Sequence, residues 1–173
     1  LVRYVGITQD ITDRRRDEEA RGRLAAIVEA AQDPIFSYGL DGIIQTWNKG
    51  SERLLGYRPQ DILGKHITLL LPPERLHEEA EIMDRLQRGM SDELLDTVRV
   101  SKDGRRVNVS VRVTPILDPQ GRVIGASKIL RDISEHKRLE EEIRQANASL
   151  EQRVTERTEE LQETIGELER FTY

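Results

Sequence analysis

One stretch decides the fold: KDGRRVNVSVRV, residues 102–113. Valine recurs at every second position from Val107 to Val113, and polar residues stand between the valines. Successive side chains of a β-strand point to opposite faces, so this alternation predicts a strand with one buried and one polar face. Lys102–Asp103–Gly104 is a turn sequence directly before it. The stretch therefore predicts the middle of an antiparallel sheet.

Strands are predicted on both sides of this one. Residues 94–100 precede the turn, and residues 123–130 follow a second turn at 118–121. Further upstream, residues 35–38 and 43–47 form a predicted hairpin whose turn contains Gly42. Two strands, several helices and then three strands predict an α+β domain: a five-stranded antiparallel sheet with helices on one side.

The segment between the hairpin and the last three strands is predicted to be helical. Asn48 can cap a short helix that reaches Leu55, with Gly56 as a left-handed terminator. Pro59 and Gly64 break residues 57–71 into short pieces. A longer helix is expected after Pro72–Pro73, ending near Gly89. Its predicted apolar stripe consists of Leu76, Ala80, Met83 and Leu86.

A sequence repeat suggests how the chain is divided. DITDRRR at residues 10–16 resembles DISEHKR at residues 132–138, and both lead into Glu-rich sequence. Self-similarity at a domain-sized spacing indicates tandem modules. Four parts are expected: residues 1–12 as the last strand of a preceding repeat, 13–32 as a linker helix, 33–133 as the sheet domain, and 134–173 as a C-terminal helix.

The C-terminal 40 residues are predicted to form one long dimerising helix. Apolar residues recur there every eleven positions, which is about 3.67 residues per turn and keeps them on one face of an almost straight helix. Such a stripe needs a partner helix, so we expect a parallel homodimer. Arg157 is the one charged residue in the predicted seam. The seam residues are Leu139, Ile143, Ala146, Leu150, Val154, Arg157, Leu161, Ile165 and Leu168.

Composition excludes several classes of protein. The net charge of −5 argues against a nucleic-acid partner. There is no cysteine, which excludes disulfides and thiolate metal sites. No apolar run approaches the length of a membrane span, so we expect no direct membrane contact from this segment and a cytoplasmic location, although the parent protein can still be membrane-bound. His66, His77 and His136 lie on separate predicted elements without a nucleophile, so no enzyme is expected.

Six short motifs resemble the Per-Arnt-Sim (PAS) family with its PAC motif, over about residues 33–134. They appear in family order and at family spacing. The motifs are Asp41–Gly42–Ile43–Ile44 with Trp47–Asn48, Leu54–Leu55–Gly56–Tyr57, Gly64–Lys65, Leu71–Pro72–Pro73–Glu74–Arg75, Lys102–Asp103–Gly104–Arg105 and Arg131–Asp132–Ile133–Ser134. The resemblance implies the PAS fold and a sensory role.

A second resemblance lies in the C-terminal helix. Residues 150–161, and the ending Phe171–Thr172–Tyr173, are similar to the connector before the phosphoacceptor helix of bacterial sensor histidine kinases. This resemblance implies downstream kinase domains in the same parent chain. It also implies that the present segment lacks the phosphoacceptor histidine and the ATP-binding domain.

No cofactor is predicted. Flavin photosensors of this family form a cysteine adduct, which this chain cannot make, and non-covalent flavin has no support in the sequence. Haem members use a histidine on the long helix, where His77 lies in a charged stripe rather than the apolar one. A small-molecule pocket is the remaining possibility. Its candidate lining residues, which are equally consistent with plain core, are Met83, Leu86, Val109 and Val111.

The predicted mechanism is a relay from sheet to helix. Asp132, Ile133 and Ser134 join the last strand to the C-terminal helix; Asp132 or Ser134 is expected to cap that helix, and Ile133 to pack at the junction. The favoured function is therefore a sensory and relay module of a sensor histidine kinase. The alternatives are a ligand-free PAS module for dimerisation or protein interaction, and a PAS domain regulating a cyclic-dinucleotide enzyme.

Overall fold

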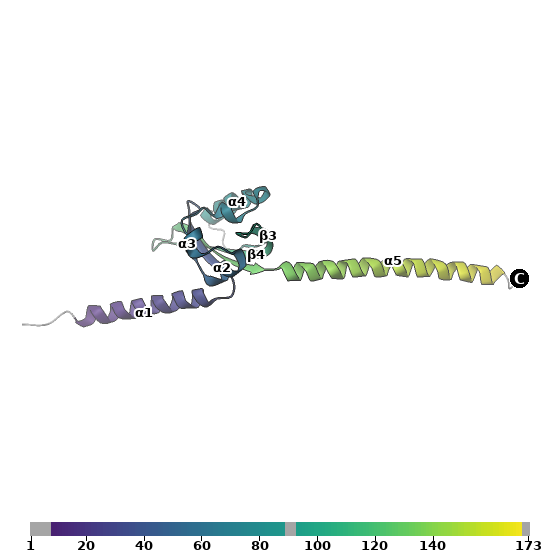
Figure 1. Ribbon diagram of the computed structural model, residues 1–173, viewed down its shortest axis with the longest axis horizontal. Helices are drawn as coiled ribbons and strands as arrows, with labels where there is room; N and C mark the ends of the chain where they lie inside the picture. Colours follow the sequence, from purple (N-terminus) through teal and green to yellow (C-terminus); the bar gives the residue numbers. More distant parts are fainter. Residues whose placement is uncertain (1–7, 89–92, 171–173) are drawn as a thin grey trace, which may run out of the picture. The chain divides into compact units, whose positions relative to one another are not determined.

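The computed structural model of the chain describes residues 8–88 and 93–170. Five strands form one antiparallel sheet in the order β2-β1-β5-β4-β3. Figure 1 draws the strands of this sheet as arrows. This is the α+β architecture that the sequence predicts. The strands are β1 (Ile35–Gly39), β2 (Ile44–Trp47), β3 (Glu93–Val100), β4 (Arg106–Leu117) and β5 (Val123–Asp132).

Strand β4, which contains the alternating valines of residues 107–113, lies between β3 and β5. Along β4, Val107, Val109, Val111 and Val113 are all buried, whereas the residues between them are half-buried or exposed. One face of the sheet therefore carries the core, as the alternation predicted. β4 extends four residues beyond the predicted end at Val113, and its register with β5 runs from Val109↔Asp132 to Leu117↔Val123.

Short helices connect β2 to β3, and long ones lie at the two ends of the chain. The α-helices are α1 (Thr8–Ala30), α2 (Lys49–Leu55), α3 (Pro59–Ile62), α4 (His77–Gln87) and α5 (Ser134–Arg170). Two 3₁₀ turns, η1 (Ile67–Leu70) and η2 (Pro73–Arg75), lie between α3 and α4. The caps of α2 are as predicted, because the Asn48 side chain accepts from the Ser51 N–H and Gly56 adopts a left-handed φ of 76°.

Asn48 also ties α1 to the sheet domain. Its Oδ1 accepts hydrogen bonds from the Ile35 and Ser51 N–H groups, both at 2.9 Å. Its Nδ2 donates to the Val28 carbonyl at 3.0 Å and to the Asp33 carbonyl at 3.1 Å. With 2% of its surface exposed, this one amide caps α2 and holds the segment that follows α1.

Two sequence predictions need correction. Residues 8–12 were expected to be strand, but α1 begins at Thr8. A helix satisfies its own backbone hydrogen bonds, whereas a strand needs a neighbour, and the described residues provide none for this segment. Residues 1–7 lie outside the described residues. The predicted stripe of α4 is also wrong at its N-terminal end, because Leu76 and Ala80 are exposed.

The chain divides into two units, Leu1–Asp132 and Ile133–Tyr173. The first helical hydrogen bond of α5 runs from the Lys137 N–H to the Ile133 carbonyl, at 2.9 Å. Ile133 therefore holds the N-cap position by its backbone, and Ser134 is the first helical residue.

Candidate functional site

Helix α4 inserts two carboxylates into the core. Glu78 and Glu79 are only 8% and 7% exposed, and the other buried residues of the helix are Ile82 and Leu86. The buried face is thus rotated from the predicted stripe by about one residue, or 100°. Burying a carboxylate is costly unless it is paired, so the partners of these two glutamates define the candidate site.

Glu78 is paired with strand β3 and with η2. The Arg75 Nη1 donates to it at 2.6 Å, the Thr97 hydroxyl at 2.8 Å and the Arg99 Nη1 at 3.2 Å. Burial alone would raise the pKa of Glu78, but the hydrogen bonds from Arg75 and Thr97, with the charge of Arg99, lower it overall. Arg99 is 1% exposed, and this burial lowers the pKa of its guanidinium.

Glu79 is paired with strand β5 instead. The Lys128 Nζ donates to the Glu79 Oε2, and Lys128 is fully buried. Burial lowers the pKa of Lys128 to about 8, even though Glu79 opposes the shift. The ammonium also lies 4.9 Å from the centre of the Tyr38 ring. Burial, and then the negative charge of Glu79, raise the pKa of Tyr38.

We call the two glutamates and the residues around them the core polar cluster. Its seven residues are Tyr38, Arg75, Glu78, Glu79, Thr97, Arg99 and Lys128. Three of its buried atoms make no hydrogen bond within the described residues, namely the Tyr38 hydroxyl, the Glu79 Oε1 and the Arg99 Nη2. Buried polar atoms are nearly always paired, so each exception needs an explanation. The cluster therefore has hydrogen-bonding capacity that the chain itself does not use.

The predicted pocket residues lie in the same core. Val109 and Val111 are fully buried, Leu86 is nearly so, and the half-buried Met83 packs against them. Thr97 is the cross-strand partner of Val109, which brings the polar cluster next to this apolar set. The lining of a pocket by these four residues stays a prediction, and none of the buried polar residues beside them was predicted from the sequence. His77, the haem candidate, is exposed on α4.

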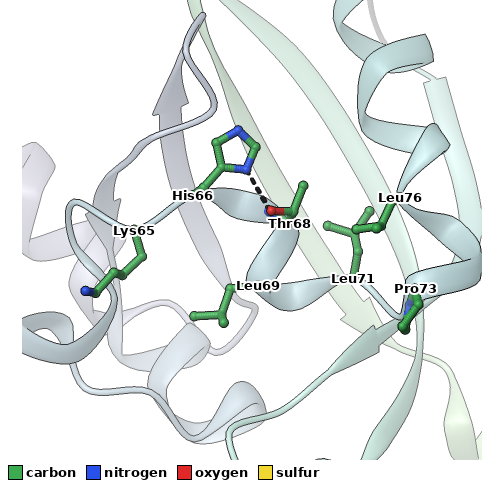
Figure 2. Close-up of a pocket in the computed structure, with 7 residues that line it drawn as sticks. All are labelled: Lys65, His66, Thr68, Leu69, Leu71, Pro73 and Leu76. Atoms are coloured by element: carbon green, nitrogen blue, oxygen red, sulfur yellow. Dashed lines mark hydrogen bonds between the residues drawn. The ribbon is translucent and has the colours of Figure 1, made fainter.

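A groove of about 520 Å³ lies on the surface over η1 and η2 (Figure 2). Leu71 and Leu76 are among its lining residues, and the Lys65 amine points away from the other labelled residues. The His66 Nδ1 and the Thr68 hydroxyl share a hydrogen bond of 2.8 Å. The groove is mostly apolar and has no group of chemically reactive residues.

The predicted seam residues all lie on α5 and are exposed in the single chain. Exposure of the leucine, isoleucine and valine residues among them ranges from 45% for Leu139 to 65% for Val154. Arg157 donates to Glu160 of its own helix at 2.6 Å. The relay residues Asp132, Ile133 and Ser134 join β5 to α5 without an intervening loop. Within residues 8–88 and 93–170, no helix combines the length and the hydrophobicity that crossing a membrane would require.

Comparisons with known proteins agree with this architecture. The family described as PAS fold matches residues 22–133. Two-component system protein A of Emericella nidulans is 33% identical over 118 residues, which cover 66% of this chain and 17% of that protein. The signal transduction histidine-protein kinase AtoS of Escherichia coli K12 is 25% identical over 120 residues, covering 69% and 19%.

The solved PAS domain of a protein from Colwellia psychrerythraea superposes with a TM-score of 0.63 at 26% identity, covering 67% of this chain and 98% of that one. The chain spans less than a fifth of the length of the two curated relatives. Sheet order, helix placement and the family match over residues 22–133 lead to one conclusion: the chain belongs to the PAS family.

Proposed function

We propose that this chain is the sensory input and relay module of a sensor histidine kinase in a two-component system. Support comes from the two curated relatives, which are a two-component system protein and a histidine kinase. In this proposal the chain acts in the cytoplasm and transfers no phosphoryl group itself. Kinase domains further along the parent chain would carry out the catalysis.

The observation that carries the proposal is the continuity of β5 and α5. Lys128 of the core polar cluster lies on β5, whose last residue is Asp132, and α5 begins at Ser134. Only five residues lie between Lys128 and the first residue of the helix, Ser134. A change in the pairing of Lys128 would shift β5, and a shift of β5 would act on the first turn of α5.

The output element is a parallel homodimer of α5 in this proposal. The 37 residues of α5 correspond to about 55 Å of helix. Its leucine, isoleucine and valine side chains at the seam positions are exposed in one chain, and a second copy of the helix would cover them. Rotation or a register change within this pair would pass the signal on to the kinase.

Insertions in α5 of the intact parent kinase test the relay. At 3.67 residues per turn, two residues inserted between Glu151 and Gln152 turn the downstream seam by about 200°, whereas eleven residues add three whole turns. The two-residue insertion is expected to uncouple autophosphorylation from the PAS stimulus, and the eleven-residue insertion to preserve the coupling. Equal effects of the two insertions would contradict a relay through a rigid seam.

A further inference from the structure

Every backbone carbonyl of the segment between α1 and β1, residues 31–34, accepts a hydrogen bond from the protein. The Arg53 Nη2 donates to the first two carbonyls, at 3.1 and 3.3 Å. The Asn48 Nδ2 donates to the third at 3.1 Å, and the Leu130 N–H donates to the fourth at 3.0 Å. A connecting segment on the surface can leave such groups to water. This one is instead held at each residue, so it has little freedom to absorb movement of α1.

The sequence stiffens the same segment. Pro34 fixes its own φ and restricts the conformation of Asp33 before it. Gly50, in the first turn of α2, lies directly on this backbone, because a Cβ there would collide with the Asp33 carbonyl group. The last turn of α1 is attached too, since the Val28 carbonyl accepts from the Asn48 Nδ2 at 3.0 Å. We call the residues of α2 and its N-cap that hold α1 and the segment the α2 clamp: Asn48, Gly50 and Arg53.

The segment is also bound to the strand that leads into α5. Besides the hydrogen bond from the Leu130 N–H to the Pro34 carbonyl, the Arg131 Nη2 lies 3.9 Å from the Asp33 Oδ2. Ser134, the first residue of α5, is three residues beyond Arg131. The end of α1 is therefore connected to the last residues before α5 through this one segment, and none of the core polar cluster takes part.

The sequence repeat indicates what α1 carries. DITDRRR at residues 10–16 lies on α1, and DISEHKR at residues 132–138 runs from the end of β5 into α5. The helix before the domain thus resembles in sequence the helix after it, which the proposed function treats as the output. Repeats of this kind are typical of tandem modules, so we expect α1 to carry the output of a preceding module of the parent chain.

We propose that the α2 clamp and residues 31–34 form a second input to α5, through which rotation of α1 by a preceding module reaches β5 without passing through the core. A rotation of α1 displaces the carbonyls that the clamp holds. Because this segment lacks the loose residues that act as a hinge, the displacement passes to Leu130 and Arg131, close to the start of α5. This inference rests on the proposed relay function and adds a route of regulation to it.

Amide hydrogen exchange of the full chain, followed by NMR, tests the connection. Arg53→Met removes the donor to the first two carbonyls of the segment, at an exposed position. The Leu130 amide bonds the segment, and the Lys137 amide makes the first helical hydrogen bond of α5. Both are expected to exchange at least about 3-fold faster in Arg53→Met, because the junction opens locally. The amides of β4, in the middle of the sheet, should keep their rates.

Arg105→Met is the matched control. Arg105 is also exposed, and its Nη2 donates to a backbone carbonyl of α2, that of Leu54, at 3.3 Å. The replacement therefore removes the same kind of bond from the same helix without touching residues 31–34. It is expected to leave the exchange of the Leu130 and Lys137 amides unchanged.

The intact parent kinase tests the regulation. Two residues inserted between Glu18 and Glu19 turn the earlier part of α1 by about 200° relative to the clamp. The insertion is expected to change basal autophosphorylation by at least about 5-fold in wild type and by less than half as much in Arg53→Met. Arg105→Met should retain the full change. The response to the PAS stimulus should survive in Arg53→Met, which a general loss of stability would not allow.

The inference is overturned if Arg53→Met and Arg105→Met have equal effects on the Leu130 amide, or if exchange accelerates equally throughout the sheet. It is also overturned if the α1 insertion has no effect, or the same effect with and without Arg53. These results would leave the relay standing wherever the two α5 insertions still differ. Equal effects of the α5 insertions would instead reject the relay, while the exchange rates would still report the connection between α1 and β5.

Discussion

The buried pair of Glu79 and Lys128 should lower the stability of the domain relative to an apolar pair. The pKa of Lys128 falls from 10.5 to about 8, and at 1.36 kcal/mol per pH unit this shift represents about 3 kcal/mol against the charged form at neutral pH. The double replacement Glu79→Leu with Lys128→Met is therefore expected to leave the free energy of unfolding unchanged or raise it by about 1–3 kcal/mol. Lys128→Met alone should lower it by about 3–5 kcal/mol, because it leaves Glu79 as an unpaired buried charge.

Urea denaturation at pH 7 measures these differences. The surface pair Asp61 and Lys102, 2.7 Å apart and partly solvent-exposed, is the matched control: Asp61→Asn with Lys102→Met should change stability by less than about 1 kcal/mol. Equal destabilisation by the single and the double core replacement would refute the reasoning, because it would mean that Lys128 contributes through packing rather than through its charge.

The same pair predicts a dependence on pH. An unfolded chain holds the proton of Lys128 up to about pH 10.5, whereas the folded chain releases it near pH 8. Between these values the unfolded state binds more protons, so this group makes the free energy of unfolding rise with pH. Wild type should thus gain up to about 3 kcal/mol on the double variant between pH 8 and 10.5. A difference that stays flat over this range would contradict the assigned burial cost.

Three other perturbations have defined outcomes. Asn48→Ala removes the cap of α2 and the bonds to Val28 of α1 and to Asp33, so it should lower the free energy of unfolding by about 3 kcal/mol in urea melts; Asn48→Asp keeps the acceptor but turns a second oxygen toward those two carbonyls, so it should be at least as destabilising. Arg157→Leu should raise the melting temperature of the helical dimer, whereas Leu150→Ala should lower it by several degrees. If Arg157→Leu leaves the melting temperature unchanged while Leu150→Ala lowers it, Arg157 lies outside the seam. Labelled ATP with magnesium should leave the chain unlabelled, and stable phosphate on any of its three histidines would reject the non-enzymatic assignment.

The parts of the fold that the sequence predicted depend on local chemistry. Asn48 and Gly56 bound α2 because a side-chain acceptor and a residue tolerant of positive φ are needed at those two positions. The buried face of β4 could also be predicted, because the alternation of valine and polar residues along this one strand shows which side chains point to the same face. The boundary of α1 was missed because the strand prediction for residues 8–12 rested on the repeat at residues 132–138, and a strand there would need a neighbouring strand that the described residues do not provide.

The polar part of the site escaped because its pairs are distant in the sequence. Glu79 and Lys128 are 49 residues apart, and neither is expected in a core until the partner is known. The sequence of β3 suggests the wrong buried face. Its valines, Val98 and Val100, are only half-buried, whereas Thr97 and Arg99 on the opposite face are buried. One signal was available: Lys128 alternates with Ala126 and Leu130, which places it on the inner face of β5.

Sedimentation equilibrium of the full chain tests the central claim most directly, which is that the PAS domain reports through a dimer of α5. At micromolar concentration the expected mass is twice the 19.9 kDa of one chain. Leu150→Asp, which puts a charge into the predicted seam, should shift that mass toward a single chain. A wild-type mass of one chain at these concentrations, or a dimer that Leu150→Asp leaves intact, would contradict the account.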